Sequence, residues 1–191
     1  MTEDLNKLSV EDLGMLFPIV LTEYNPEWRN KFLAEKELLL DSLKTVKIIG
    51  IEHIGSTAIP GLIAKPTIDI LLEIKDGADI SHMTEQLKRI GYNSIPKPEN
   101  PPPHLMFVKG YSITGYCGQK YHIHIRYLGD WDELVFRDYL VRNPDVVQLY
   151  AGLKKRLSVS YKNDREKYTD AKTDFIKDII QRARKELDNL P

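Results

Sequence analysis

The chain contains a single cysteine, Cys117, so no disulfide can form within it and paired thiolates cannot hold a metal. We therefore expect the protein to work in a reducing compartment, the cytoplasm. The N-terminus is acidic rather than basic, which argues against a signal peptide. No run reaches the roughly 20 apolar residues that a membrane-spanning helix needs, so we expect no membrane partner.

An excess of charge of either sign is also absent, because the formal net charge is −1. Proteins that bind nucleic acid need basic side chains to neutralise phosphates, so the composition gives no signal for that class of partner. Residues 151–191 are locally basic, but the charges are spread along expected helices and are typical of a solvated face. We find no internal repeat.

The 191 residues are 42% hydrophobic and 29% charged, which is typical of a globular protein. We expect one domain over 1–191, with a loose N-terminus at 1–8 and a helical C-terminal part at 131–191. Alternating β-like and helical periodicity predicts an α/β fold with a mixed sheet of about five strands and flanking helices. The expected strands are 18–23, 47–54, 67–74, 104–109 and 121–128. The expected helices are 9–16, 26–44, 81–90, 131–142, 144–161 and 169–187, and the proline-rich segment 96–103 is expected to be a stiff loop.

The strand expected at 67–74 carries an acid among isoleucines. Side chains alternate across a strand, so Asp69 points away from the core face that Ile68 and Ile70 share. Aspartate is depleted in strands, which favours a functional role for Asp69. The alternative is a carboxylate on an edge strand that faces water.

The segment between this strand and the preceding one carries Gly55, Ser56 and Thr57. Glycine allows backbone N–H groups to approach a phosphate closely, and the two hydroxyls are further donors. Lys65 could add a positive charge to the same anion. The alternative is an ordinary turn, with Lys65 in solvent.

The strand expected at 121–128 places three titratable or cationic side chains, His122, His124 and Arg126, on one face. A single histidine is more often structural than functional. A row of three such side chains indicates the wall of a cleft.

The stretch from His53 to Asp69, HIGSTAIPGLIAKPTID, closely resembles the hallmark segment of the GrpB family, which belongs to the nucleotidyltransferase-fold superfamily. The resemblance covers most of the chain. It extends over 24–28 (YNPEW), 122–126 (HIHIR), 136–140 (FRDYL) and 168–172 (YTDAK). It implies a nucleotidyltransferase-like mixed sheet, and it picks out Lys172, as a ligand-binding residue, together with Tyr168. The alternative for Lys172 is a side chain in solvent.

The superfamily pattern supplies Gly-Ser for phosphates and two acids separated by one residue, often with a third acid on a later strand. These carboxylates hold Mg²⁺, so Mg²⁺ or Mn²⁺ is the cofactor that the resemblance implies. This chain departs from the pattern, because Thr67 or Leu71 stands where the partner acid of Asp69 would be. Glu73 shares the face of Asp69 but lies about 13 Å away along a strand. A single ion held by Asp69 and His124 is the remaining arrangement, and an imidazole ligand favours a transition metal.

Two hypotheses follow from these residues. In the first, the protein transfers a nucleotidyl group, with Asp69 and His124 catalytic and with phosphate bound by Gly55, Ser56, Thr57, Lys65, His122, Arg126 and Lys172. In the second, the protein is a non-catalytic module that binds a nucleotide or a coenzyme-A-type ligand and has lost the full acid set. Both predict that Asp69, the histidines and Gly55-Ser56 converge on one cleft.

Overall fold

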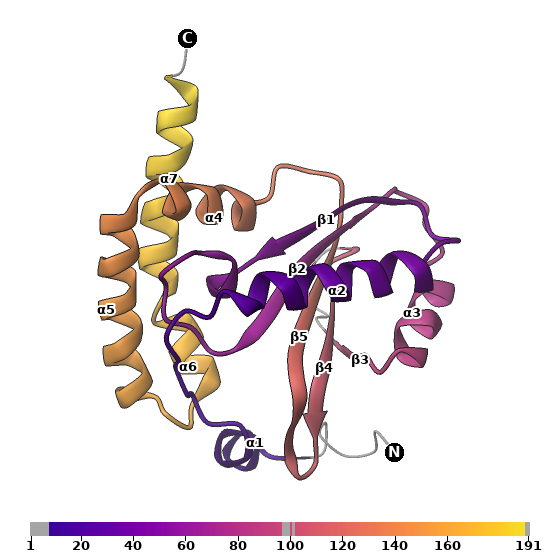
Figure 1. Ribbon diagram of the computed structural model, residues 1–191, viewed down its shortest axis with the longest axis horizontal. Helices are drawn as coiled ribbons and strands as arrows, with labels where there is room; N and C mark the ends of the chain where they lie inside the picture. Colours follow the sequence, from indigo (N-terminus) through magenta and orange to yellow (C-terminus); the bar gives the residue numbers. More distant parts are fainter. Residues whose placement is uncertain (1–7, 97–99, 101, 190–191) are drawn as a thin grey trace.

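A five-stranded mixed sheet forms the centre of the molecule in the computed structural model, which describes residues 8–96, 100 and 102–189 (Figure 1). Strands β2 and β5 pair in parallel, and the other neighbours are antiparallel. The expected mixed α/β fold is therefore confirmed. In sheet order the strands are β1 (Ile48–Ile54), β2 (Thr67–Ile74), β5 (Gly115–Tyr127), β4 (Leu105–Ser112) and β3 (Asn93–Ile95).

Seven α-helices and one short 3₁₀ turn accompany the sheet in this part of the chain. Figure 1 shows α4 to α7 gathered on one side of the molecule, while α2 crosses the sheet. The helical elements are α1 (Val10–Leu16), α2 (Glu27–Ser42), η2 (Ser56–Ala58), α3 (Ile80–Arg89), α4 (Asp132–Arg142), α5 (Pro144–Ser160), α6 (Arg165–Asp170) and α7 (Thr173–Asp188).

The apolar face of β2 forms the core, as its alternation predicts. Ile68, Ile70, Leu72 and Ile74 are fully buried and belong to one cluster with Trp28 of α2. The alternating residues of β5, Ile123 and Ile125, join the same cluster. A second cluster joins the segment 59–63 to the C-terminal helices α4, α5 and α7. The opposite face of β2 and β5 is thereby left to the side chains of Asp69 and the histidine row.

Local signals place two helix starts correctly. Ser9 caps α1 in a capping box with Asp12, and Asp79 accepts a hydrogen bond from the backbone N–H of His82 at the start of α3. No helix in the described residues is long and apolar enough to cross a membrane.

Several boundaries differ from the expectation. The strand expected at 18–23 does not form, because Ile19 N–H donates to Lys162 O while Thr22 makes an isolated bridge to Ala64. These partners lie in different segments and do not build a ladder. Strand β5 begins at Gly115 rather than at 121, because the hairpin turn follows Ser112. The short strand β3 was not expected.

The expected last helix, 169–187, is instead two helices. Helix α6 ends at Asp170 and α7 begins at Thr173, so Lys172 lies at the junction between them. Asn143 does not cap α5 with its side chain, which donates instead to Tyr139 O at the end of α4. Residues 1–7 of the expected loose N-terminus, and residues 97–99 and 101 of the expected proline-rich loop, lie outside the described residues.

Candidate functional site

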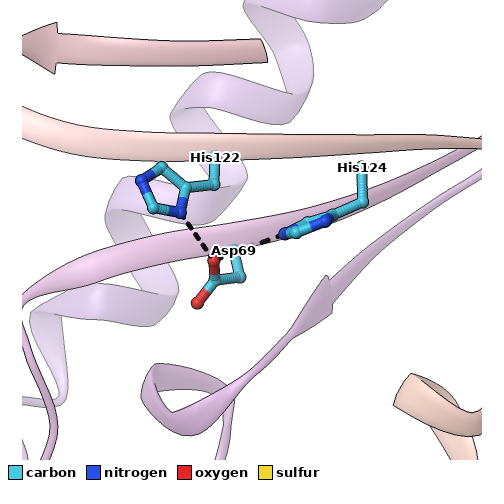
Figure 2. Close-up of side chains that lie close together, drawn as sticks. All are labelled: Asp69, His122 and His124. Atoms are coloured by element: carbon cyan, nitrogen blue, oxygen red, sulfur yellow. Dashed lines mark ion pairs between the residues drawn. The ribbon is translucent and has the colours of Figure 1, made fainter. Parts of the chain in front are cut away.

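Asp69 lies in an interior strand, because β2 is flanked by β1 and β5. The parallel register pairs Asp69 with His122 and Leu71 with His124, so Asp69 and both imidazoles share one face. Asp69 Oδ1 is 3.2 Å from His122 Nδ1 and 3.5 Å from His124 Nε2 (Figure 2). The alternative interpretation of Asp69 as an edge-strand carboxylate is therefore wrong.

The two imidazoles keep Asp69 ionised. Burial raises its pKa, but the hydrogen bonds from His122 and His124 outweigh burial and hold the pKa of Asp69 well below its usual range. Burial lowers the pKa of His122, so its neutral ring donates from Nδ1 to Asp69. His122 Nε2 then accepts from the Tyr111 hydroxyl, 2.7 Å away. The carboxylate is thus a fixed negative charge at the surface of the site.

Gly55 packs directly against Asp69. Its φ is +70° and its ψ is −170°, a conformation that is essentially restricted to glycine. A Cβ atom built there would lie 2.6 Å from Asp69 Oδ2. The close approach that the structure shows at this glycine is to the carboxylate of Asp69, whereas the sequence predicted an approach of its backbone to a phosphate.

Thr57 does not face the ligand space, contrary to its expected role. Its side chain is 2% exposed, and its hydroxyl donates to Thr67 O at 3.0 Å. Because that single proton is used, the hydroxyl accepts from His53 Nε2, also at 3.0 Å. Thr57 instead ties the 3₁₀ turn η2 to β1 and β2.

A cavity of about 1080 Å³ opens over this face of the sheet. All the other sequence-predicted site residues line it, so the expected convergence on one cleft is observed. These residues are Gly55, Ser56, Lys65, Asp69, His122, His124, Arg126 and Lys172.

The C-terminal helices contribute side chains that sequence reasoning missed. Lys154 and Tyr150 of α5 and Arg165 of α6 line the cavity. Tyr168, which the family resemblance picks out, lines it as well. Lys154 follows Val147, Tyr150 and Ala151 on the buried face of α5, and a lysine on an apolar stripe is a signal that could have identified it. No comparable pattern marks Arg165.

Four cations that line the cavity, Lys65, Lys154, Lys172 and Arg165, form a basic cluster. The ammonium groups of Lys65 and Lys172 lie 5.5 Å and 4.3 Å from the centroid of the Tyr168 ring. Burial, reinforced by neighbouring cations, lowers the pKa of Lys65 to about 7. Burial likewise lowers the pKa of Lys172 to about 8 and that of Lys154 well below its usual value.

Acidic side chains also line the cavity, but their environment differs from that of Asp69. Glu133 pairs with Arg126 at 3.6 Å, and Asp132 pairs with Arg184 at 2.7 Å. Glu166 and Asp170 are exposed on α6. The basic cluster therefore has Asp69 as its electrostatic partner, and Arg126 is partly engaged by Glu133.

The residues present do not fit a pair of magnesium ions. Thr67 and Leu71, which occupy the positions of a partner acid, are both buried and offer no carboxylate. Glu73 is also buried, and its carboxylate accepts from Gly129 N–H at 3.2 Å. Within the described residues, the one group of three potential metal ligands is Asp69, His122 and His124.

The mixed sheet and the cleft over its polar face define an α/β protein with a cavity that gathers basic side chains around Asp69. The GrpB family model, described as GrpB protein, matches residues 18–182, and the chain belongs to this family.

Relatives and solved structures agree with this assignment. The UPF0157 protein of Pseudomonas aeruginosa is 42% identical over 161 residues, which are 83% of this chain and 65% of that relative. The chain thus spans just under two thirds of the length of this relative. The crystal structure of the conserved protein GrpB from Enterococcus faecalis superposes with a TM-score of 0.76 at 31% identity, covering 88% of this chain and 99% of that one. A dephospho-CoA kinase of Mycolicibacterium paratuberculosis is 27% identical over 191 residues, which are 87% of this chain and 46% of the kinase.

Proposed function

We propose that the cavity binds a nucleotide or another phosphate-bearing metabolite, with its phosphates at the basic cluster. The observation that carries this proposal is the convergence of three lysines and Arg165 on one cavity, which Ser56 and Tyr168 also line. The single carboxylate of Asp69 offsets the mutual repulsion of these cations only in part. A bound ligand with several negative charges would relieve the rest of this repulsion.

Hydrogen-bond donors support the same ligand class. Tyr168 is 1% exposed, and its hydroxyl finds no hydrogen-bond partner among the described residues. A buried hydroxyl without a partner costs free energy, and a phosphate oxygen would satisfy it once the side chains that cover the hydroxyl move aside. Ser56 adds a second hydroxyl from the loop. The expected ligands Lys65 and Lys172 keep their proposed role, while Lys154, Arg165 and Tyr168 join them.

Two functions use this site, and different observations favour each. Nucleotidyl transfer with Asp69 and His124 as catalytic residues is favoured by an ionised carboxylate at the cavity wall, held by two imidazoles. A binding module for a nucleotide or coenzyme-A-type ligand is favoured by the absence of a partner acid at Thr67 and Leu71. The similarity to part of a dephospho-CoA kinase supports the coenzyme-A-type ligand.

Calorimetry with ATP and with coenzyme A tests the proposed anion site. Replacing Lys65 or Lys172 by alanine should weaken binding by about 1–3 kcal/mol, the range for a charge-assisted contact. The matched control is Lys167→Ala, because Lys167 lies on α6 beside Tyr168 but is exposed and pairs with Asp164. Unchanged affinity in both lysine variants would remove the basis of the proposal.

The substitution Asp69→Asn separates the two functions. In a transferase it should abolish turnover, because the fixed negative charge at the reacting centre is lost. In a binding module it removes repulsion between a carboxylate and the bound phosphate, so affinity should be unchanged or higher. Calorimetry and a nucleotidyl-transfer assay on the same variant measure both effects. Tighter binding, together with no turnover by the unmodified protein, would exclude the transferase.

A further inference from the structure

We propose that Asp69, His122 and His124 form a mononuclear transition-metal site, in place of the paired-acid magnesium site of the nucleotidyltransferase pattern. The three side chains come from the neighbouring parallel strands β2 and β5, and their ligand atoms all lie within 4.8 Å of one another. Figure 2 shows both rings directed at one carboxylate oxygen. The site is therefore built by rigid strands rather than by loops.

The donor separations suit one ion. Two bonds of about 2.1 Å at a tetrahedral angle place their donor atoms about 3.4 Å apart. The observed separations from Asp69 Oδ1 are 3.2 Å to His122 Nδ1 and 3.5 Å to His124 Nε2. A small adjustment of the side chains would direct the three donors at one ion, without a change in the backbone. Positions facing the cavity remain for water or a phosphate oxygen.

The donor set selects the class of metal. Two imidazole nitrogens and one carboxylate suit Zn²⁺, Fe²⁺, Co²⁺ or Ni²⁺, whereas Mg²⁺ prefers oxygen ligands in an octahedral shell. The buried residues Thr67 and Leu71 cannot add the carboxylates that magnesium requires. The site therefore favours a transition metal over Mg²⁺.

Tyr111 is the positioning residue for this site. Its hydroxyl lies 2.7 Å from His122 Nε2, and the two rings stack at a centroid distance of 5.7 Å and an angle of 22°. When a metal takes Nδ1, Nε2 carries the proton and donates to this hydroxyl. Such hydrogen bonds orient a ligating histidine and raise its basicity. Phe17 holds the Tyr111 ring from the other side, at a centroid distance of 5.3 Å.

Titration of the metal-free full-length protein with Co²⁺, followed by its visible absorption, tests the site. We expect one Co²⁺ per chain, displaced by an equimolar amount of Zn²⁺ but not by millimolar Mg²⁺. His122→Ala and His124→Ala should each weaken Co²⁺ binding at least tenfold. His82→Ala is the control, because His82 contacts Thr45 on a distant surface and should leave the affinity unchanged.

The role of Tyr111 has its own test. Tyr111→Phe should weaken Co²⁺ binding about 10–100-fold and shift the absorption bands. The variant also loses the hydrogen bond to His122 in the metal-free protein, so its thermal stability should fall, and the absorption bands are the readout that a merely structural role would not move. Tyr116→Phe is the matched control, because the ring of Tyr116 also packs on Phe17 and Tyr111, but its hydroxyl contacts Pro18 O and Arg165 rather than His122. An absorption spectrum of bound Co²⁺ that is identical in Tyr111→Phe would refute the positioning role.

The proposal is overturned if Co²⁺ binds no more tightly than Mg²⁺. It is also overturned if neither His122→Ala nor His124→Ala weakens Co²⁺ binding. Its failure is distinguishable from failure of the phosphate proposal. The Co²⁺ titration contains no phosphate, and Lys172→Ala, which weakens phosphate binding, should leave Co²⁺ affinity unchanged or slightly higher, since a nearby cation is removed.

Discussion

Gly55 illustrates how one residue is fixed by two independent constraints. Its backbone lies in a region that side-chain-bearing residues avoid, and its missing Cβ makes room for the Asp69 carboxylate. Gly61 has a similar φ of +76°, but no atom lies within 4 Å of a Cβ built there. Gly61 therefore shows the cost of a positive φ alone, whereas Gly55 combines a positive φ with the glycine-only ψ and the contact with Asp69.

We predict that Gly55→Ala lowers the free energy of unfolding more than Gly61→Ala does. A positive φ should cost Gly61→Ala about 1–2 kcal/mol, and the glycine-only region of Gly55 should cost Gly55→Ala about 1–3 kcal/mol. Gly55→Ala also drives a methyl group into Asp69, so its total cost should reach about 3 kcal/mol or more, and Co²⁺ binding should weaken. Chemical denaturation of both variants measures the difference. Equal destabilisation would show that Asp69 moves aside at no cost.

At the scale of elements, the side-chain hydroxyl of Thr57 joins three of them. It binds His53 at the end of β1 and the carbonyl of Thr67 at the start of β2, while Thr57 itself lies in η2. His53 in turn stacks on Phe32 of α2 at a centroid distance of 4.8 Å. Burial is the main reason that the pKa of His53 falls to about 4, so the ring is neutral and its Nε2–H donates to Thr57.

We predict that Thr57→Val destabilises the fold without removing a ligand contact. Valine keeps the shape of threonine but leaves His53 Nε2–H and Thr67 O without their partner, which should cost about 1–3 kcal/mol in free energy of unfolding. Thr57→Ser keeps the hydroxyl and is the control. Denaturation and calorimetry with ATP measure the two effects. If Thr57→Val instead loses affinity at unchanged stability, the hydroxyl contacts the ligand after all.

The junction of α6 and α7 also acts at this scale. Lys172 lies in the short break between α6 and α7, and its ammonium group is 4.3 Å from the centroid of the Tyr168 ring. Residues at i and i+4 are also neighbours in a continuous helix, so helical spacing is enough to bring these two side chains together. The break instead lets α7 start in a direction of its own after Tyr168 and Lys172 have been placed at the cavity.

At the scale of the whole molecule, a nearly neutral protein concentrates positive charge in one cavity. The formal net charge is −1, yet Lys65, Lys154, Lys172 and Arg165 meet there. Burial and mutual repulsion bring the pKa of Lys65 to about 7 and that of Lys172 to about 8. Both pKa values lie close to neutral pH, so binding of an anion near neutral pH should change the protonation of these two lysines.

We predict that ATP affinity falls as pH rises from about 7 to 9. A bound phosphate favours the charged lysines, so binding above pH 7 takes up protons, and this uptake costs more as the pH rises. Calorimetry at pH 8 in two buffers with different ionisation enthalpies should report proton uptake. Lys65→Arg is the control, because arginine stays charged and should flatten the pH dependence. Proton release on binding would contradict the prediction.

We predict that the contribution of Lys65 and Lys172 to the stability of the ligand-free protein rises with pH, whereas ATP affinity falls. In the unfolded chain both lysines regain a pKa of about 10.4, so between about pH 8 and pH 10 the unfolded state binds more protons than the folded state. Their contribution to the free energy of unfolding therefore rises with pH over this range. Urea denaturation at pH 7.5 and 9.5 checks the sign, and the slope should decrease in Lys65→Met. An equal slope in that variant would show that Lys65 titrates normally.

The sequence by itself determined which side chains share a face. A strand has a period of two, so the alternation of residues 67–74 and 121–128 was sufficient to place Asp69, His122 and His124 opposite the apolar core. Capping by Ser9 and Asp79 was equally local. The fold class was predicted from these periodicities, which depend only on neighbours within a few residues. The family resemblance, which covers most of the chain, predicted the same class.

The tertiary structure decided which distant segments meet. Lys154 and Arg165 reach the cavity from helices about 85 to 95 residues beyond Asp69, Thr57 turns inward to bind His53, and segment 18–23 finds no single partner strand. No local pattern specifies these contacts, because they depend on how the C-terminal helices pack against the loop after β1. Strand periodicity fixes the direction of a side chain, whereas the composition of the cavity depends on the packing of elements remote in the sequence.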